Sequence, residues 1–153
     1  FRDHFYFDPE NKVPRALVRG MTPADLDILR TVRIVSEYVY IAAESAPIAS
    51  LSFLENLEII EGRSGLNQNK QTLAISLNDN LAHLGLRKLR EIKKGDVVIS
   101  RNVDLCYVDS IVWKDIVKGT NSTFNINSNR LAADCREDNK VCSNMCDETA
   151  GCW

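Results

Sequence analysis

Three segments of the chain share one spacing of apolar residues. LRTVRIV begins at Leu29, LENLEII at Leu54 and LRKLREI at Leu86, and each is apolar at positions i, i+3 and i+6. Each is followed by a short alternating segment: YVYI, TLAIS and DVVIS. A fourth, degenerate copy runs from IVWKDI to TFNIN. A unit of this size cannot bury its own apolar residues, so the copies are expected to stack.

The two halves of each copy predict different elements. An i, i+3, i+6 pattern over seven residues is too short for an independent helix and predicts one or two helical turns against a core. The alternating segments predict strands with one buried face. The sequence therefore predicts a β-solenoid, a parallel β-helix of leucine-rich-repeat-like coils with short helices on one side. The residues expected to point inward are Val39, Ile41, Leu73, Ile75, Val97, Ile99, Phe124 and Ile126.

Asparagines mark the expected turns. Asn78, Asn102 and Asn129 each come three residues after the second inward residue of a strand. An Asn side chain can satisfy backbone groups at a turn. Because the three are in matching register, we expect them to stack from one copy to the next.

The opposite faces of the strands form two outward columns. One contains Tyr40, Ala74, Val98 and Asn125, and the other contains Ala42, Ser76, Ser100 and Asn127. Tyr40 and Val98 can be ordinary exposed strand residues. They can also be the apolar strip of a protein-binding surface, because exposed apolar groups rimmed by polar ones mark interfaces.

Nothing in the sequence predicts catalysis. The two histidines, His4 and His83, are far apart, and His83 is expected at the surface or in a turn. No phosphate-binding glycine loop, nucleophile motif or zinc-protease motif occurs. The net charge of −2 gives no indication of nucleic-acid binding. We expect a binding surface, with no cofactor and no metal. The polar loop from Gly62 to Gln71 is longer than its turn needs, and such loops often carry binding residues.

The cysteines leave three interpretations open. Four of the five lie between Cys135 and the last residue, Trp153. They can form a zinc site, remain free and buried, or form an extracellular disulfide framework in which one thiol has lost its partner by truncation. We favour the disulfides, and Asn121-Ser122-Thr123, a glycosylation acceptor, agrees with secretion. Since the chain starts with Phe1, we expect a processed or excised piece.

Several motifs in order resemble the epidermal growth factor (EGF) receptor family. They are LDILRTVRIVSEYVYI, FLENLEIIEGR, LGLRKLREIKKGDVVISRNVDLCYVDSIVWKDI and VCSNMCDETAGCW. The similarity runs from about Thr22 onward. It implies a right-handed solenoid that is the second receptor L domain (extracellular domain III), over residues 1–135. Residues 136–153 would then start a cysteine-rich, furin-like module, and the family's N-terminal coil would be missing.

The resemblance also implies structural roles for the C-terminal residues. Cys106 is expected to pair with Cys135, and Cys142 with Cys152. Cys146 would be unpaired because its partner lies beyond the chain. Trp153 would act as a wedge that closes the open end of the repeats.

The family's ligand-contact positions carry over where the motifs align. Asp3 would pair with an arginine of the ligand, with Phe5 beside it. Ala42 and Asn127 depart from the family's residue types and put the identity of the ligand in doubt. The expected ligand-binding residues are Asp3, Phe5, Tyr40, Ser76, Val98, Ser100 and Asn127.

The implied function is that of the extracellular ligand-binding L domain of an EGF-receptor-like receptor tyrosine kinase. An EGF-like growth factor would bind and favour dimerisation, with the kinase elsewhere in a single-pass membrane receptor. The expected partners are that ligand, the first L domain and cysteine-rich domains of the same receptor, and a second receptor, but no nucleic acid. A secreted L-domain protein that sequesters ligand without a kinase is the alternative. A leucine-rich-repeat scaffold is disfavoured, because the first two copies lack LxxLxLxxN.

Overall fold

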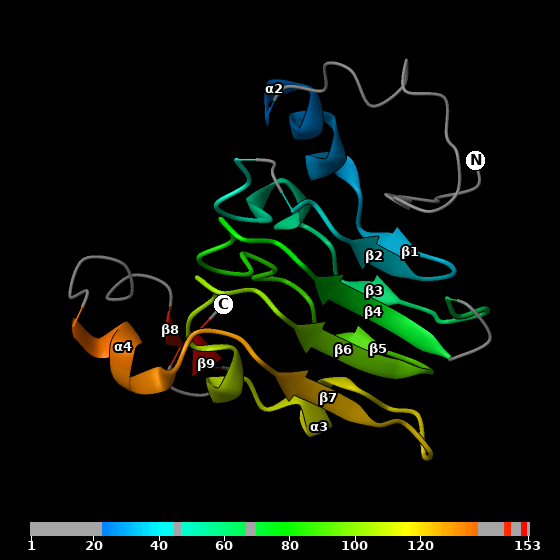
Figure 1. Cartoon of the computed structure of the whole chain (residues 1–153). Helices are drawn as coiled ribbons and strands as arrows, with labels where there is room; N and C mark the ends of the chain where they lie inside the picture. Colours follow the sequence, from blue (N-terminus) through cyan, green and yellow to red (C-terminus); the bar gives the residue numbers. More distant parts are fainter. Residues whose placement is uncertain (1–22, 45–46, 67–69, 138–145, 148–150, 153) are drawn as a thin grey trace.

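The chain passes back and forth between two small parallel sheets (Figure 1). The structure is a computed structural model that describes residues 23–44, 47–66, 70–137, 146–147 and 151–152. The larger sheet has the order β2-β4-β6-β7, and the smaller has the order β1-β3-β5. The strands of the larger sheet are β2 (Val39–Ile41), β4 (Gln71–Ser76), β6 (Asp96–Ser100) and β7 (Phe124–Asn127). Those of the smaller sheet are β1 (Ile34–Val35), β3 (Ile59–Ile60) and β5 (Glu91–Ile92).

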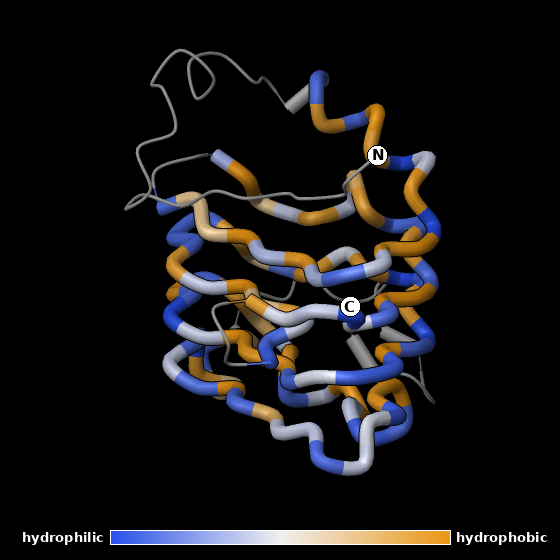
Figure 2. Tube along the Cα trace, turned by 90° about the vertical axis from the view of Figure 1, so that its right-hand side faces the viewer, coloured by the Kyte–Doolittle hydropathy of each residue, from blue (hydrophilic) through white to orange (hydrophobic). Residues whose placement is uncertain are grey.

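Equivalent residues of successive copies align across the larger sheet. One inward row contains Val39, Leu73, Val97 and Phe124, and the next contains Ile41, Ile75, Ile99 and Ile126. Most of these side chains belong to the core, together with residues from the smaller sheet. Figure 2 shows the layers stacked one above another, with apolar and polar residues alternating along them. The predicted inward set and its register are therefore confirmed, with one exception.

Phe124 is the exception, because its side chain is 44% exposed. In the described part of the chain, β7 pairs with β6 and has no strand on its other side. The other edge strand, β2, keeps its inward Val39 and Ile41 buried, so the edge position alone does not account for the exposure of Phe124. The alternation of the sequence predicts which face is inward but not how much of it is covered.

The predicted β-solenoid is wrong for this structure, which has two small parallel sheets and few helices. The segments expected to be helical turns form only a single turn and then extend. The backbone N–H groups of Val32, Leu57 and Leu89 donate to the carbonyl groups three residues earlier, and two-residue strands follow. A turn followed by a strand buries positions i, i+3 and i+6 as a helix would, so the spacing could not separate the two.

The helical segments are short and lie outside the sheets. None of those described is long and apolar enough to cross a membrane. They are α2 (Pro23–Leu26), η1 (Asp27–Thr31), η2 (Ser52–Leu54), η3 (Val108–Ser110), α3 (Trp113–Ile116) and α4 (Ala132–Glu137). Near the C-terminus, β8 (Cys146–Asp147) pairs antiparallel with β9 (Gly151–Cys152).

The predicted asparagine ladder is confirmed. Asn78 is 3% exposed. Its Oδ1 accepts a hydrogen bond from the backbone N–H of Ala43, and its Nδ2 donates to the carbonyl of Ile41. The Nδ2 of Asn78 also donates to Oδ1 of Asn102 at 2.9 Å, and Asn102 donates in the same way to Asn129 at 2.9 Å. Each amide thus links one turn to the next and satisfies backbone groups that would otherwise be buried without partners.

A disulfide joins Cys106 to Cys135, the pair that the resemblance implies. It links α4 to the turn after β6, and the hydroxyl of Tyr107 donates to the carbonyl of Cys135 at 2.7 Å. Cys135 is 2% exposed. Because it is bonded to Cys106, Cys135 does not serve as a free thiolate ligand, which removes the zinc site that would have used it.

Candidate functional site

The outward face of the larger sheet brings Tyr40 and Val98 into one row. Tyr40 pairs in register with Ala74, Ala74 with Val98, and Val98 with Asn125. Neighbours in such a row are about 4.8 Å apart. Tyr40 and Val98 are half-buried, and Ala74 between them is only 2% exposed. The three side chains form an apolar strip that runs across three strands, which we call the apolar strip below.

A polar row lies beside the apolar strip. Ser76, Ser100 and Asn127 are aligned, and the two serine hydroxyls are 3.3 Å apart. At the edge strand, the side-chain amide of Asn127 donates to Oδ1 of Asn125. The hydroxyl of Ser128 donates to Oδ1 of Asn127 at 3.1 Å. The face therefore changes from apolar at β2 to polar at β7.

This arrangement is suited to binding and not to proton transfer. The described carboxylates with a lowered pKa, Glu58 and Glu61, are in segments that flank β3 of the other sheet. In Glu58 the pKa is lowered mainly by the hydrogen bond from Arg33, and in Glu61 mainly by that from Lys93. The described residues contain no cluster of three or more histidine, cysteine or acidic side chains that could hold a metal.

His83, predicted to be a surface or turn residue, is half-buried. It forms an isolated bridge with Ser50, and its Nδ1 is buried without a hydrogen-bond partner among the described residues. Burial has the largest effect in lowering the pKa of His83, and the positive charge of Arg87 lowers it further. The burial of this nitrogen could not be recognised from the position of His83 just before a repeat.

The other predicted site residues are spread over the chain. Asn121 is exposed in the turn before β7, away from the apolar strip. Cys146 and Cys152 lie opposite each other in the β8–β9 pair, and the partner of each thiol stays a prediction. Asp3, Phe5, Cys142 and Trp153 lie outside the described residues.

A comparison with protein families decides where the chain belongs. A model of the receptor L domain family matches residues 7–117. The chain belongs to the receptor L domain family. The match is to a receptor module, in keeping with the prediction that this segment does no catalysis.

Curated relatives of this receptor L domain confirm the resemblance to the EGF receptor family. It is 37% identical to the epidermal growth factor receptor of Gallus gallus and 35% identical to that of Drosophila melanogaster, each over 87% of this chain. It is 30% identical to the receptor tyrosine-protein kinase erbB-4 of Homo sapiens over 92% of the chain. It spans only 18%, 9% and 10% of these three proteins, respectively.

Sequence reasoning missed a cationic cavity at the corner between the two sheets. It has a volume of about 530 Å³ and is bordered by residues 62–65, 93–96 and 118–122. The signal was present in the glycines and cations of the polar loop that starts at Gly62. The loop alone could not show that two further lysine-containing segments pack beside it.

Proposed function

We propose that this receptor L domain binds an EGF-like growth factor on the outward face of the larger sheet. It would be part of the extracellular region of an EGF-receptor-like receptor tyrosine kinase, in which binding favours dimerisation. The observation that carries the proposal is the continuous apolar strip of Tyr40, Ala74 and Val98 beside the hydroxyls of Ser76 and Ser100. Apolar centres with polar rims are typical of protein interfaces.

The relatives and the disulfide support an extracellular setting. Two of the relatives are epidermal growth factor receptors by name, and a third is a receptor tyrosine kinase. Disulfides such as Cys106–Cys135 persist in oxidising compartments. The domain boundary after residue 135, the identity as the second L domain and the contacts of Asp3, Phe5 and Asn127 are parts of the same proposal.

Calorimetric titration with an EGF-like growth factor tests the binding face. Val98→Asp should weaken binding by about tenfold or more, because a carboxylate in a desolvated apolar contact has no partner. Val103 is 58% exposed in the turn after β6, so Val103→Asp is a matched control that should bind normally. Asp3→Asn should also weaken binding if it pairs with a ligand arginine.

Monitoring the folding of each variant separates a loss of binding from a loss of structure. Circular dichroism spectra of all variants should match that of the unsubstituted chain. Unchanged affinity in both Val98→Asp and Asp3→Asn would overturn the assignment of this face. A membrane-spanning segment and kinase motifs in the full transcript would separate a receptor from a secreted protein that sequesters ligand.

A further inference from the structure

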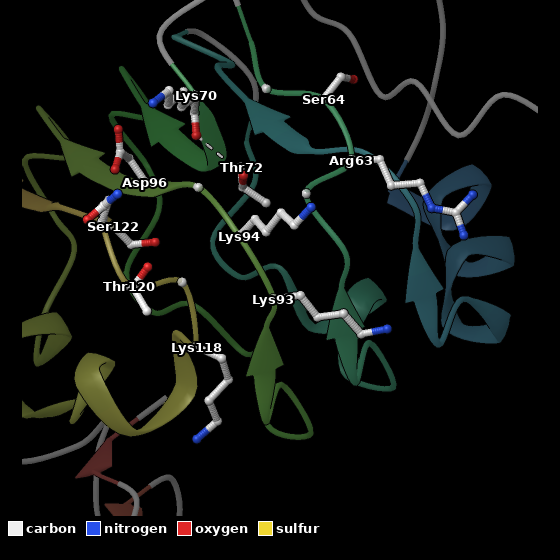
Figure 3. A pocket seen from close by; sticks show the side chains of 15 residues that line it. Arg63, Ser64, Lys70, Thr72, Lys93, Lys94, Asp96, Lys118, Thr120 and Ser122 are labelled. Carbon is white, nitrogen blue, oxygen red and sulfur yellow. Dashed lines mark hydrogen bonds between the residues drawn. The ribbon is translucent and has the colours of Figure 1, made fainter.

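We propose that a second site binds an anionic carbohydrate in the cavity at the corner between the sheets. The cavity lies before the amino-terminal ends of β4, β6 and β7, and Figure 3 shows its side chains coming from three neighbouring segments. It is separate from the apolar strip, which crosses the middle of β2, β4 and β6. The two sites can therefore be tested independently.

The lining of the cavity carries an excess of positive charge. The single carboxylate among the described lining residues, Asp96, accepts the backbone N–H of Thr123 at 2.7 Å. Nearby Glu61 is paired with two cations, Lys93 at 3.0 Å and Arg63 at 2.7 Å. A concave surface with an excess of one sign of charge concentrates ligands of the opposite sign. The cationic lining residues are Arg63, Lys70, Lys93, Lys94 and Lys118.

Lysines occupy equivalent positions in two successive layers at the cavity. The backbone N–H of Lys93 donates to Ile60 and that of Lys118 donates to Ile92, both at 2.9 Å, so these lysines occupy equivalent positions. Layers of parallel strands are about 4.8 Å apart. The equivalent position in the preceding layer is Glu61, which pairs with Lys93. Two lysines one layer apart are suited to a ligand that carries two neighbouring anionic groups.

The remaining lining favours a sugar over an acidic peptide. The described lining residues include the hydroxyls of Thr120, Ser122 and Ser64, of which the last donates to Glu37 at 2.5 Å, but no aliphatic or aromatic side chain. The hydroxyl of Thr72 is buried and donates to the carbonyl of Lys70. A peptide would find no apolar pocket there, whereas a sulfated or carboxylated sugar offers hydroxyls and anionic groups together.

Close packing of the backbone shapes the cavity. Gly62 and Gly95 have φ of 63° and 94°, and a Cβ on Gly95 would lie 1.8 Å from Oγ1 of Thr72. A Cβ on Gly62 would lie 2.3 Å from the carbonyl oxygen of Lys94. A preformed site of this kind needs less ordering when a ligand binds.

The carbohydrate has two possible sources. A free sulfated polysaccharide and a glycan attached to Asn121, which is itself a lining residue, share the same chemistry. If an attached glycan fills the cavity, its enzymatic removal should strengthen binding of an added oligosaccharide. If the free polysaccharide is the ligand, removal should leave that binding unchanged.

Titration of the 153-residue chain with a heparin-derived oligosaccharide tests the proposal. Lys70→Gln/Lys94→Gln should weaken binding at least tenfold and reduce its dependence on salt, because two of the cavity's charges are lost. The control Lys88→Gln/Lys114→Gln removes two exposed lysines outside the cavity. Its affinity for the oligosaccharide should stay within twofold of that of the unsubstituted chain. A chemically desulfated oligosaccharide should bind at least tenfold more weakly.

Two results would overturn the site. One is the absence of binding by the unsubstituted chain in both glycosylated and deglycosylated forms. The other is an equal loss of affinity in the cavity and control double variants, which would indicate nonspecific charge attraction. Binding of the growth factor should be unaffected in Lys70→Gln/Lys94→Gln, so failure of this site is distinguishable from failure of the binding face.

Discussion

At the residue scale, the stability of the turns depends on buried amides. Asn102 is inaccessible to solvent and accepts hydrogen bonds from both the backbone N–H and Nδ2 of Asn78. It also donates to the carbonyl of Ile75 at 3.1 Å. An apolar residue there would leave several buried polar groups without partners, which is more costly than the loss of the bonds themselves.

We therefore predict that Asn102→Ala lowers the free energy of unfolding by about 3 kcal/mol. Asn125→Ala changes the same residue type at an exposed position and should cost less than about 0.5 kcal/mol. Urea denaturation followed by circular dichroism measures both. Equal losses in the two variants would show that the ladder does not stabilise the fold.

The residue before each ladder asparagine has a left-handed backbone. Leu77, Arg101 and Ser128 have φ of 60°, 58° and 54°. This conformation costs a non-glycine residue about 1–2 kcal/mol and is worst for β-branched side chains. These residues permit the chain to leave each strand at the angle that places the next amide in the ladder.

A pair of substitutions at Ser128 tests the strain. Ser128→Gly and Ser128→Val both remove the hydroxyl bond to Asn127, so their difference reports the backbone. The glycine variant should be more stable by about 1–2 kcal/mol, measured by thermal denaturation. A valine variant that is as stable as the glycine variant would contradict a left-handed residue at this turn.

At the scale of elements, ion pairs connect the segments that flank the smaller sheet. Its strands are only two residues long and so offer few ladder hydrogen bonds. Glu58 binds Arg33 at 2.8 Å and Arg90 at 3.2 Å, each from a neighbouring layer. These hydrogen bonds hold the pKa of Glu58 below its ordinary value of 4.5, and the bond from Arg33 has the largest effect.

A carboxylate with a lowered pKa in the fold contributes stability above its unfolded pKa and loses it as the pH falls through the folded pKa. We predict that the difference in unfolding free energy between the unsubstituted chain and Glu58→Gln shrinks as the pH falls below 4.5. Because the pairs are exposed, the effect should be small and should weaken in salt. Glu44→Gln, at an exposed turn, is the control. A pH-independent difference would contradict the ion-pair account.

At the scale of the whole molecule, the disulfide closes the chain around its last layer. Cys106 and Cys135 are 29 residues apart in sequence, and the segment between them contains α3 and β7. A cross-link of this length stabilises a fold by about 3–4 kcal/mol in the chain-entropy model. It holds α4 against the turn after β6.

We predict that Cys106→Ser/Cys135→Ser lowers the free energy of unfolding by about 3–4 kcal/mol. The loss should exceed that of the control Ala132→Ser/Ala133→Ser, which introduces two serines at exposed positions of α4, measured by chemical denaturation. An unchanged denaturation midpoint would mean that α4 and β7 are held by packing alone. A growth-factor affinity that survives the loss of the disulfide would show that the binding face does not depend on α4.

The sequence by itself determined which strand residues face inward and their register, because alternation of period two allows one buried face per strand. It also determined that the three asparagines are aligned in a ladder. It also placed Tyr40 and Val98 in one row and identified the family. Only the tertiary structure decided that the i, i+3, i+6 segments end as strands of a second sheet, since a turn and a strand bury the same positions. Packing likewise decided the exposure of Phe124 at the edge, the burial of Ala74 and of Nδ1 of His83, and the cationic cavity. These depend on neighbours from other copies of the repeat, and local patterns do not carry that information.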